Sequence, residues 1–302
     1  MVGVNLVYVP EMAEVAEFYR NSEHYQDEDI ISLEDYKASN IEGKVLLLGR
    51  KGYYHHKNLD HIAMLKEKKV VSRGDDLSLV LTDMHSDYRY CYSNPFDVYV
   101  NPIPRDAVPK YGNWAAFGIK MELFSNIIMI GQHPNCVCSL NNLRKKKADT
   151  GEWMHALRHI EIYPSKPLFV EDAFHSESEQ FLLENPSVAS HIVTVDESRR
   201  NCIFIMFKPW YDVSFASAKT GIVADTDLDV LNEDEMKVDY PWQGGLTTDQ
   251  LILSISNLPA EKLEAALVSG FTEHEELREP HALNNLSRIL AAYTQKLTQP
   301  TQ

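Results

Sequence analysis

Three side chains that could bind a metal ion follow one apolar run of this sequence. Residues 77–82 read LSLVLT, and the next five read DMHSD. Alternate side chains of an extended chain project to one side, so Asp83, His85 and Asp87 should share a face at the carboxyl end of a strand. Two carboxylates and an imidazole suit Mn²⁺, Fe²⁺ or Zn²⁺, and the lack of a thiolate in the motif argues against a structural zinc site. The spacing therefore predicts a metal site.

A second set of carboxylates follows the apolar residues 221–224. Asp225, Asp227 and Asp229 are again spaced by two, which predicts that they share one face at a strand end. Carboxylates that converge in an acidic protein repel each other unless cations neutralise them. Two divalent ions about 3.5–4 Å apart could share a carboxylate and hold a bridging hydroxide that attacks an electrophilic carbon.

The elements that must position both motifs are strands alternating with helices. Continuous apolar strands joined by helices are typical of a parallel sheet covered on both faces, and such sheets bind ligands beyond the carboxyl ends of their strands. We expect the acidic stretch 23–35 at the surface. The expected strands are 4–9, 44–49, 77–82, 126–131, 160–163, 191–195, 201–207, 221–224 and 265–271, and the expected helices are 13–21, 62–68, 115–124, 152–158, 176–183, 249–257 and 283–297.

Composition excludes several classes of protein. The formal net charge of −15, from 44 acidic and 29 basic residues, disfavours nucleic acid or an anionic membrane as the main partner. No apolar run approaches the roughly 18–20 residues of a membrane span. Four cysteines do not make a disulfide scaffold in 302 residues, and no signal segment opens the sequence. We expect a cytoplasmic protein of one domain, 1–302, with a long loop at 88–111 and a small-molecule substrate. A homo-oligomer is compatible with the sequence.

Four motifs, in their order and separations, resemble those of the arginase/ureohydrolase superfamily. That family shows Gly-Asp-His, then Asp-x-His-x-Asp, then Ser-x-Asp-x-Asp-Val-Leu-Asp-Pro, then Gly-Gly-Leu-Thr at the start of a helix. The corresponding segments here are 60–61 (DH), 83–87 (DMHSD), 227–232 (DLDVLN) and 244–247 (GGLT). The resemblance covers roughly 44–132 and 220–297 and fades over about 133–200. It implies a three-layer α/β/α sandwich on a mainly parallel sheet of about eight strands.

The same resemblance implies a binuclear hydrolase of a linear C–N bond in a guanidino or amidino substrate. It implies two Mn²⁺ ions per chain, with Fe²⁺ or Zn²⁺ as alternatives, and a bridging hydroxide as nucleophile. Asp225 falls on the family's serine and is a reserve ligand if the register shifts by two. Asp83 and Asp227 would each bind both ions. The six implied ligands are His61, Asp83, His85, Asp87, Asp227 and Asp229.

Other family positions are less well matched. The family's substrate-side glutamate corresponds to Glu275, with Glu273 as the alternative. The family's Gly-Asn-x-His loop is replaced by Gly112-Asn113 followed by Trp114, so the histidine that shuttles protons is not identified. Arg89 stands where arginases have an asparagine, which favours an anionic or otherwise different substrate over arginine. The candidate shuttles are His55, His56 and His133.

Two other functions are compatible with these residues. The first is amide hydrolysis, as in the deacetylase branch of the same fold. The second is a non-catalytic metal-binding protein that kept the ligands and lost the proton shuttle. A separate zinc site at His133, Cys136 and Cys138 would lack a fourth ligand, and buried thiols explain these cysteines better.

Overall fold

The computed structural model describes most of the chain outside its middle third. No helix in this described part is both long enough and apolar enough to cross a membrane. The described residues are 3–20, 29–49, 52–85, 87, 109, 112, 114–133, 160–166, 168–173, 192–193, 202–238, 244–270 and 279–300.

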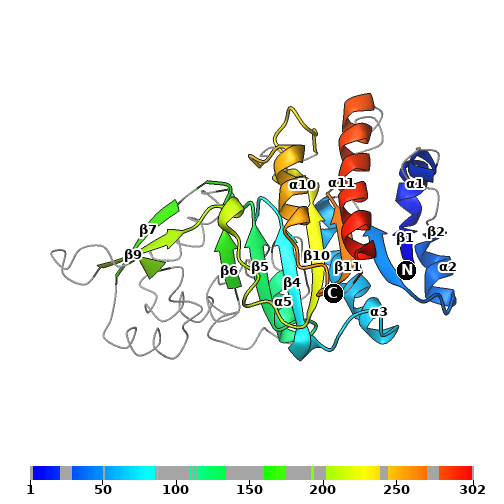
Figure 1. Ribbon diagram of the computed structural model, residues 1–302, viewed down its shortest axis with the longest axis horizontal. Helices are drawn as coiled ribbons and strands as arrows, with labels where there is room; N and C mark the ends of the chain where they lie inside the picture. The colour runs from blue at the N-terminus through cyan, green and yellow to red at the C-terminus, as the bar shows by residue number, and fades with distance from the viewer. Residues whose placement is uncertain are drawn as a thin grey trace.

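A sheet of eight parallel strands forms the centre of the molecule (Figure 1). Its strand order is β2-β1-β3-β11-β10-β4-β5-β6, and every neighbouring pair is parallel, which confirms the predicted sheet. The strands are β1 Val4–Tyr8, β2 Asp29–Ser32, β3 Lys44–Leu48, β4 Leu77–Thr82, β5 Asn126–Ile130, β6 Ile160–Tyr163, β10 Gly221–Asp227 and β11 Leu263–Ser269.

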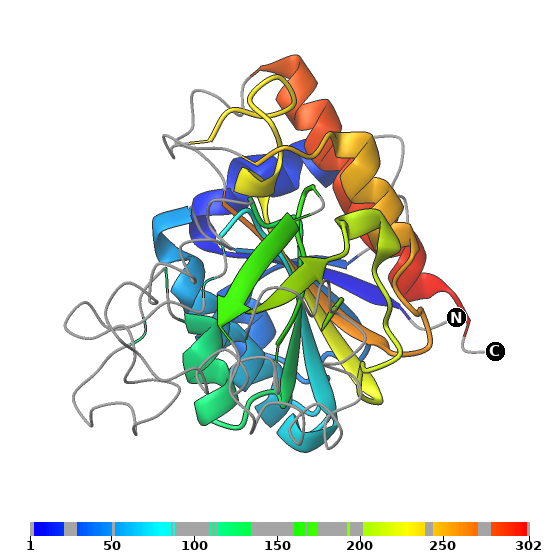
Figure 2. The ribbon, with the colours of Figure 1, turned by 90° about the vertical axis from the view of Figure 1, so that its left-hand side faces the viewer.

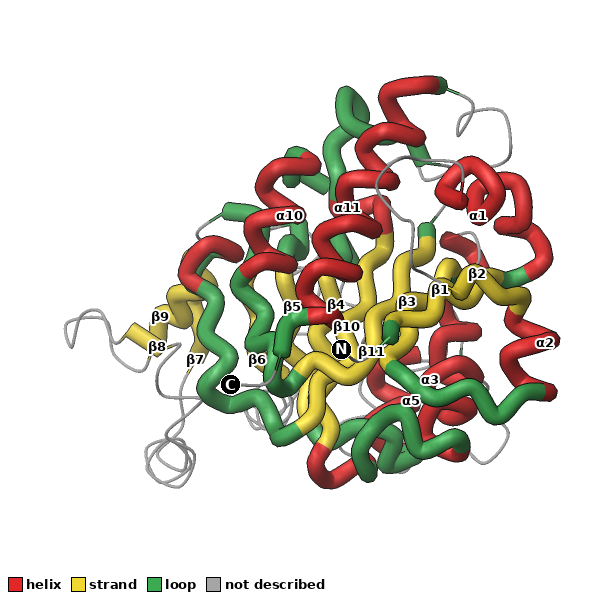
Figure 3. Tube along the Cα trace, turned by 45° about the vertical axis from the view of Figure 1, so that its right-hand side comes forward, coloured by secondary structure: helices red, strands yellow, loops and turns green. Residues whose placement is uncertain are grey.

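Helices cover both faces of this sheet, so the fold has the three predicted layers. Helices α1, α10 and α11 lie on one face, and α3 and α5 lie on the other (Figure 3). The helices are α1 Ala13–Arg20, α2 Leu33–Ala38, α3 Asn58–Glu67, α5 Trp114–Lys120, α10 Thr248–Ser256 and α11 Pro280–Thr298. The short 3₁₀ helices are η1 Pro10–Met12, η2 Gly52–Lys57, η3 Gly74–Asp76, η5 Trp210–Asp212 and η6 Leu228–Val230.

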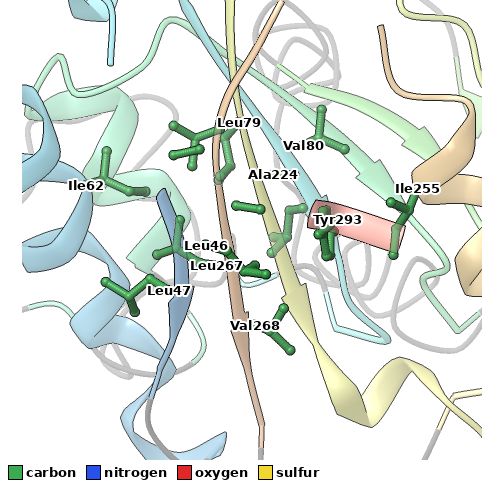
Figure 4. Packing of buried hydrophobic residues seen from close by; sticks show 14 of the residues in the cluster. Leu46, Leu47, Ile62, Leu79, Val80, Ala224, Ile255, Leu267, Val268 and Tyr293 are labelled. Carbon is green, nitrogen blue, oxygen red and sulfur yellow. The ribbon is translucent and has the colours of Figure 1, made fainter. Parts of the chain in front are cut away.

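The central strands are buried on both faces, which explains their continuous apolar runs. Every residue of β4 and of β10 is buried. Ile62 of α3 packs from one side, and Tyr293 of α11 packs from the other, where its hydroxyl lies 2.6 Å from Thr226 Oγ1. Figure 4 shows further members of this core from the strands, among them Leu46, Leu47, Leu79, Val80, Ala224, Leu267 and Val268.

A second sheet lies beyond β6 at one end of the molecule (Figures 1 and 2). It has the order β7-β9-β8, with β7 Leu168–Ala173, β8 Ile192–Val193 and β9 Cys202–Phe207, and its strands are antiparallel. The expected strands 191–195 and 201–207 therefore exist, but they do not join the central sheet. The apolar character of these two segments did not predict which strands they pair with.

Two strands were not expected, namely β7 of the second sheet and the edge strand β2. Residues 29–32 pair with β1 as the edge strand β2, inside the acidic stretch that we expected only at the surface. An edge strand has a single neighbour, so its short apolar segment is poorly distinguished from a loop. The expected helices 152–158 and 176–183 lie outside the described residues, as does nearly all of the loop 88–111.

Candidate metal centre

The pairing of β4 with β10 brings the two acidic motifs together. Thr82 lies opposite Thr226 in this parallel register, so the next residues, Asp83 and Asp227, emerge side by side at the carboxyl edge. Asp83 is 1 % exposed and Asp227 is 4 % exposed. Local strand alternation and one long-range pairing are therefore enough to bring together two carboxylates that are distant in the sequence.

His85 and Asp229 form one side of the centre. His85 Nδ1 lies 2.8 Å from Asp229 Oδ2 and 3.5 Å from Asp83 Oδ1. Asp229 lies in the turn η6, where its own backbone N–H donates to Asp227 Oδ1 at 3.1 Å and fixes its position. Asp83, His85 and Asp229 form a group whose ligand atoms all lie within 4.8 Å of one another. We refer to it as the second ligand group.

His55 forms the other side of the centre. It lies in η2, shortly after β3, and is 1 % exposed. Its Nδ1 atom is 2.9 Å from Asp87 Oδ2, 3.0 Å from Asp227 Oδ2 and 3.7 Å from Asp83 Oδ2. His55, Asp83 and Asp87 also offer ligand atoms within 4.8 Å of one another. We call them the first ligand group.

Asp83 belongs to both ligand groups. Its Oδ2 atom faces His55, and its Oδ1 atom faces His85. Oδ2 is buried and has no hydrogen-bond partner among the described residues. A carboxylate with one oxygen toward each group is arranged as a bridging ligand between two ions, and a buried oxygen without a donor needs such a partner.

Asp87 is held in place by α5. Its backbone has a positive φ of 43°, and its carbonyl oxygen accepts a hydrogen bond from Ala115 N at 3.1 Å. Trp114 Nε1 donates to Asp87 Oδ2 at 2.5 Å, and the indole ring lies 5.0 Å from the ring of His55. Trp114 thus contacts His55 and holds the carboxylate of Asp87 in place, and both residues belong to the first ligand group.

Both histidines of the centre carry raised pKa values. Burial lowers the pKa of His55, but the charges of Asp225 and Asp227 and the hydrogen bonds to them outweigh burial and raise it well above its ordinary value. Burial also lowers the pKa of His85, whereas hydrogen bonds to Asp229 and Asp83 raise it to about 12. Without a metal, the surrounding carboxylates therefore keep these imidazoles protonated.

The carboxyl groups have too little positive charge around them. Burial, together with the charges of Asp87 and Asp229, raises the pKa of Asp83 well above its usual value. Burial and the neighbouring Asp227 likewise raise the pKa of Asp229. Burial would also raise the pKa of Asp227, but the charge of His55 holds it below its usual value. A divalent cation in each ligand group would supply the missing charge, so these residues fit a binuclear site.

Two glycine-containing segments close around the centre. Gly244 N donates to Asp229 O at 2.6 Å, and a Cβ at Gly244 would lie 2.0 Å from the carbonyl oxygen of Val230. The motif Gly-Gly-Leu-Thr thus packs directly on η6. Gly270 follows β11 with a φ of +83°, and a Cβ there would lie 1.9 Å from Asp227 Oδ1. Both glycines leave room for the chain to approach the acidic motif.

The two ligand groups contain His55 and His85 but not His61, which was an expected ligand. His61 is buried in α3 and belongs to neither ligand group, and His55 takes the place that we expected for it. The relevant signal in the sequence is closeness to a strand end, because ligands gather beyond the carboxyl ends of the strands. His55 lies in the turn between the end of β3 and the start of α3.

The remaining candidates lie around the centre or outside the described residues. His133 is partly buried, and its backbone N–H donates to Met84 O at 2.9 Å. Burial, Lys166 and His85 lower its pKa. Burial and Lys57 lower the pKa of His56. The following candidates lie outside the described residues: Arg89, Cys136, Cys138, Glu273 and Glu275.

Comparison with solved structures identifies the architecture. Formimidoylglutamase from Bacillus subtilis subsp. subtilis str. 168 has a TM-score of 0.57 at 12% identity, over 98% of this chain and 87% of that chain. Arginase from Bacillus caldovelox has a TM-score of 0.56 at 14% identity, over 100% of both chains. Proclavaminate amidino hydrolase from Streptomyces clavuligerus has a TM-score of 0.55 at 12% identity, over 98% and 93%. No protein-family model and no curated protein matches the sequence. The chain therefore has the fold of the arginases and related ureohydrolases.

Proposed function

We propose that this protein is a metal-dependent hydrolase of a linear C–N bond in a guanidino or amidino compound. The observation that carries this proposal is the carboxylate of Asp83, whose two oxygens face the histidines of two adjacent ligand groups. The similar structures include an amidino hydrolase and a formimidoylglutamase by their names. The order of the four sequence motifs also supports a place in the ureohydrolase superfamily as a divergent member.

The ligands of the first ion would be His55, Asp83, Asp87 and Asp227. The second ion would bind His85, Asp229 and the same two shared carboxylates. Carboxylate and imidazole donors suit Mn²⁺, and they also accept Fe²⁺ or Zn²⁺. When bound, two such cations lower the pKa of a water molecule between them and stabilise negative charge at the attacked carbon.

Side chains of the protein would exclude water from one side of the centre, leave the other side open to the substrate, and transfer protons. The side chains of His55 and Asp83 are 1 % exposed, whereas that of His85 is 18 % exposed, so the substrate would approach from the His85 side. We propose His133 as the group that carries a proton away, because its backbone N–H donates to Met84 O, beside His85, and because burial and Lys166 lower the pKa of its ring. Glu275, or Glu273 in its place, remains our candidate for orienting the substrate.

The first experiment is metal analysis of protein purified without chelator, followed by a screen of guanidino, amidino and formimino compounds for release of urea, formamide or ammonia. About two Mn²⁺ per chain and turnover of one compound class are expected. The test variant is Asp83→Asn, which should lose both ions. Its matched control is Asp76→Asn, the same change at an exposed position near the amino end of β4.

Three results would contradict the proposal. Wild-type protein that stays metal-free after incubation with Mn²⁺, Fe²⁺ or Zn²⁺ excludes a metal-dependent enzyme. Loaded protein that cleaves only acylated amines is an amide hydrolase instead. Equal metal content in Asp83→Asn and Asp76→Asn would show that the ions bind elsewhere.

A further inference from the structure

Asp225 is a buried carboxylate that belongs to neither ligand group. It is 0 % exposed and precedes Asp227 by two residues on β10. Its Oδ2 atom lies 3.2 Å from His55 Nε2 and accepts a hydrogen bond from Asn58 Nδ2 at 2.8 Å. Asn58 also donates to Ser269 Oγ at 3.3 Å. His55 of η2 and Asn58 of α3 thus both reach this carboxylate of β10, and Ser269 of β11 is a further partner of Asn58.

The two nitrogens of the His55 ring face different partners. Nδ1 faces Asp87 and Asp227 at 2.9 and 3.0 Å, whereas Nε2 faces Asp225. A neutral imidazole carries its proton on one nitrogen and offers a lone pair on the other. If Nε2–H donates to Asp225, the lone pair of Nδ1 points toward the carboxylates of the first ligand group.

From the contact between Asn58, Asp225 and His55, we infer that Asp225 is a positioning residue for the first metal ion. It accepts the Nε2–H of His55 and thereby presents Nδ1 of that ring to the ion. This inference rests on the proposed function, because it requires that His55 bind a divalent cation. Carboxylates behind metal-binding histidines fix ring orientation and increase ligand basicity, and their removal typically weakens metal binding about 10–100-fold.

The geometry argues against Asp225 as a ligand of the same ion. It lies on the Nε2 side of the imidazole, and an ion bound at Nδ1 lies on the other side of the ring. Asp225 Oδ2 is already engaged by Asn58 and His55. The residue that the sequence left as a reserve ligand therefore acts through His55.

The test measures Mn²⁺ binding to each of the two sites by titration followed with electron paramagnetic resonance. Asp225→Ala removes the acceptor and should weaken one of the two ions about 10–100-fold while the other binds as in wild type. Asp225→Asn keeps an acceptor oxygen, so it should weaken the same ion by less. Thr226→Val is the matched control: Thr226 is the next buried residue of β10, and its hydroxyl contacts Tyr293 on the other face of the sheet.

A double-mutant cycle separates positioning from a general effect on the fold. In a His55→Ala background, Asp225→Ala should change the affinity of the first site, which keeps Asp83, Asp87 and Asp227, by less than about twofold, since the residue through which it acts is gone. A merely structural role would weaken both ions in both backgrounds.

Three results would overturn the inference. They are wild-type affinity for both ions in Asp225→Ala and Asp225→Asn, equal weakening of both ions, and an undiminished effect in the His55→Ala background. In each case the wild-type protein still binds two ions, so the proposed function survives. Wild-type protein that binds no divalent cation overturns the proposed function together with this inference.

Discussion

A single indole group supports two residues of the first ligand group. Trp114 is completely buried, donates to Asp87 and lies against the ring of His55. The sequence drew attention to it only because a family histidine is missing from the Gly-Asn-x-His loop. In the structure it is part of the support of the candidate centre.

Trp114→Phe should weaken binding of one Mn²⁺ ion about tenfold, because phenylalanine keeps an aromatic ring and loses the N–H donor to Asp87. Isothermal titration calorimetry measures the affinity. Trp210→Phe is the control, since Trp210 is also buried but packs against Tyr211 in η5. Equal affinities in the two variants would mean that the Asp87 carboxylate needs no donor from α5.

A substitution at Gly270 should affect both the stability of the fold and the metal content of the centre. Gly270→Ala should cost about 1–2 kcal/mol for the left-handed backbone and should also displace Asp227, so that metal content falls. Gly43→Ala imposes similar strain at φ +122°, next to Gly3 near the start of β3, and should lower stability alone. Chemical denaturation and elemental analysis measure the two effects. Full metal content in Gly270→Ala would exclude Asp227 as a shared ligand.

Metal affinity should rise with pH. His55 and His85 have raised pKa values and are protonated near pH 7 without metal, but only a neutral imidazole can bind an ion. Each ion must therefore displace at least one proton, and affinity should increase about tenfold per pH unit for each proton released. Calorimetry at pH 6–8 in buffers of different ionisation enthalpy counts these protons. A pH-independent affinity without proton release would contradict the ligand assignment.

At the scale of elements, the position of the centre depends on where strands end. The acidic motifs follow β4 and β10, and the pairing of these strands places Asp83 beside Asp227. The segment Gly-Gly-Leu-Thr then closes over η6, with an isolated parallel bridge between Leu231 and Leu246. Short, fixed connections hold the two ligand groups at the ends of rigid strands.

Thr247 anchors the helix that follows this segment. Its hydroxyl accepts from Gln250 N at 3.2 Å, and Gln250 Oε1 accepts from Thr247 N at 2.9 Å, which makes a capping box. Thr247→Ala should therefore lower the free energy of unfolding by about 1 kcal/mol. Ser256→Ala, in the last turn of α10, is the control and should cost less. Urea unfolding measures both, and equal costs would contradict a role for the cap.

At the scale of the whole molecule, an acidic chain concentrates buried negative charge in one place. The formal net charge is −15, and the five aspartates at 83, 87, 225, 227 and 229 are all buried together. Such a site destabilises the metal-free fold, because buried carboxylates without cations are costly.

Divalent cations should therefore stabilise the entire protein. At a free Mn²⁺ concentration of 100 times Kd, each site should add about 2.7 kcal/mol to the free energy of unfolding, and EDTA should reverse the effect. Thermal unfolding of wild type and of Asp83→Asn measures this. The variant should respond little, and an equal response of both proteins would mean that Mn²⁺ stabilises through other sites.

The sequence alone determined the elements that depend on local pattern. Continuous apolar runs predicted the buried parallel strands, and the period-two spacing predicted carboxylates at the ends of β4 and β10. These features follow from strand geometry and need no knowledge of distant residues. The edge strand β2 and the second sheet were harder to predict, because partner choice is a property of the folded chain.

Only the tertiary structure decided which histidine meets the carboxylates and what Asp225 does. His55 and His61 are six residues apart, and both come between β3 and β4 in the sequence. The turn η2 brings His55 to the strand ends, whereas His61 is buried in α3 and belongs to neither ligand group. The tertiary structure also distinguishes Asp225 from Asp227, because Asp225 faces Nε2 of the His55 ring and Asp227 faces Nδ1. Pattern fixes which face of a strand a side chain occupies, but contacts between residues distant in sequence depend on how strands and helices pack.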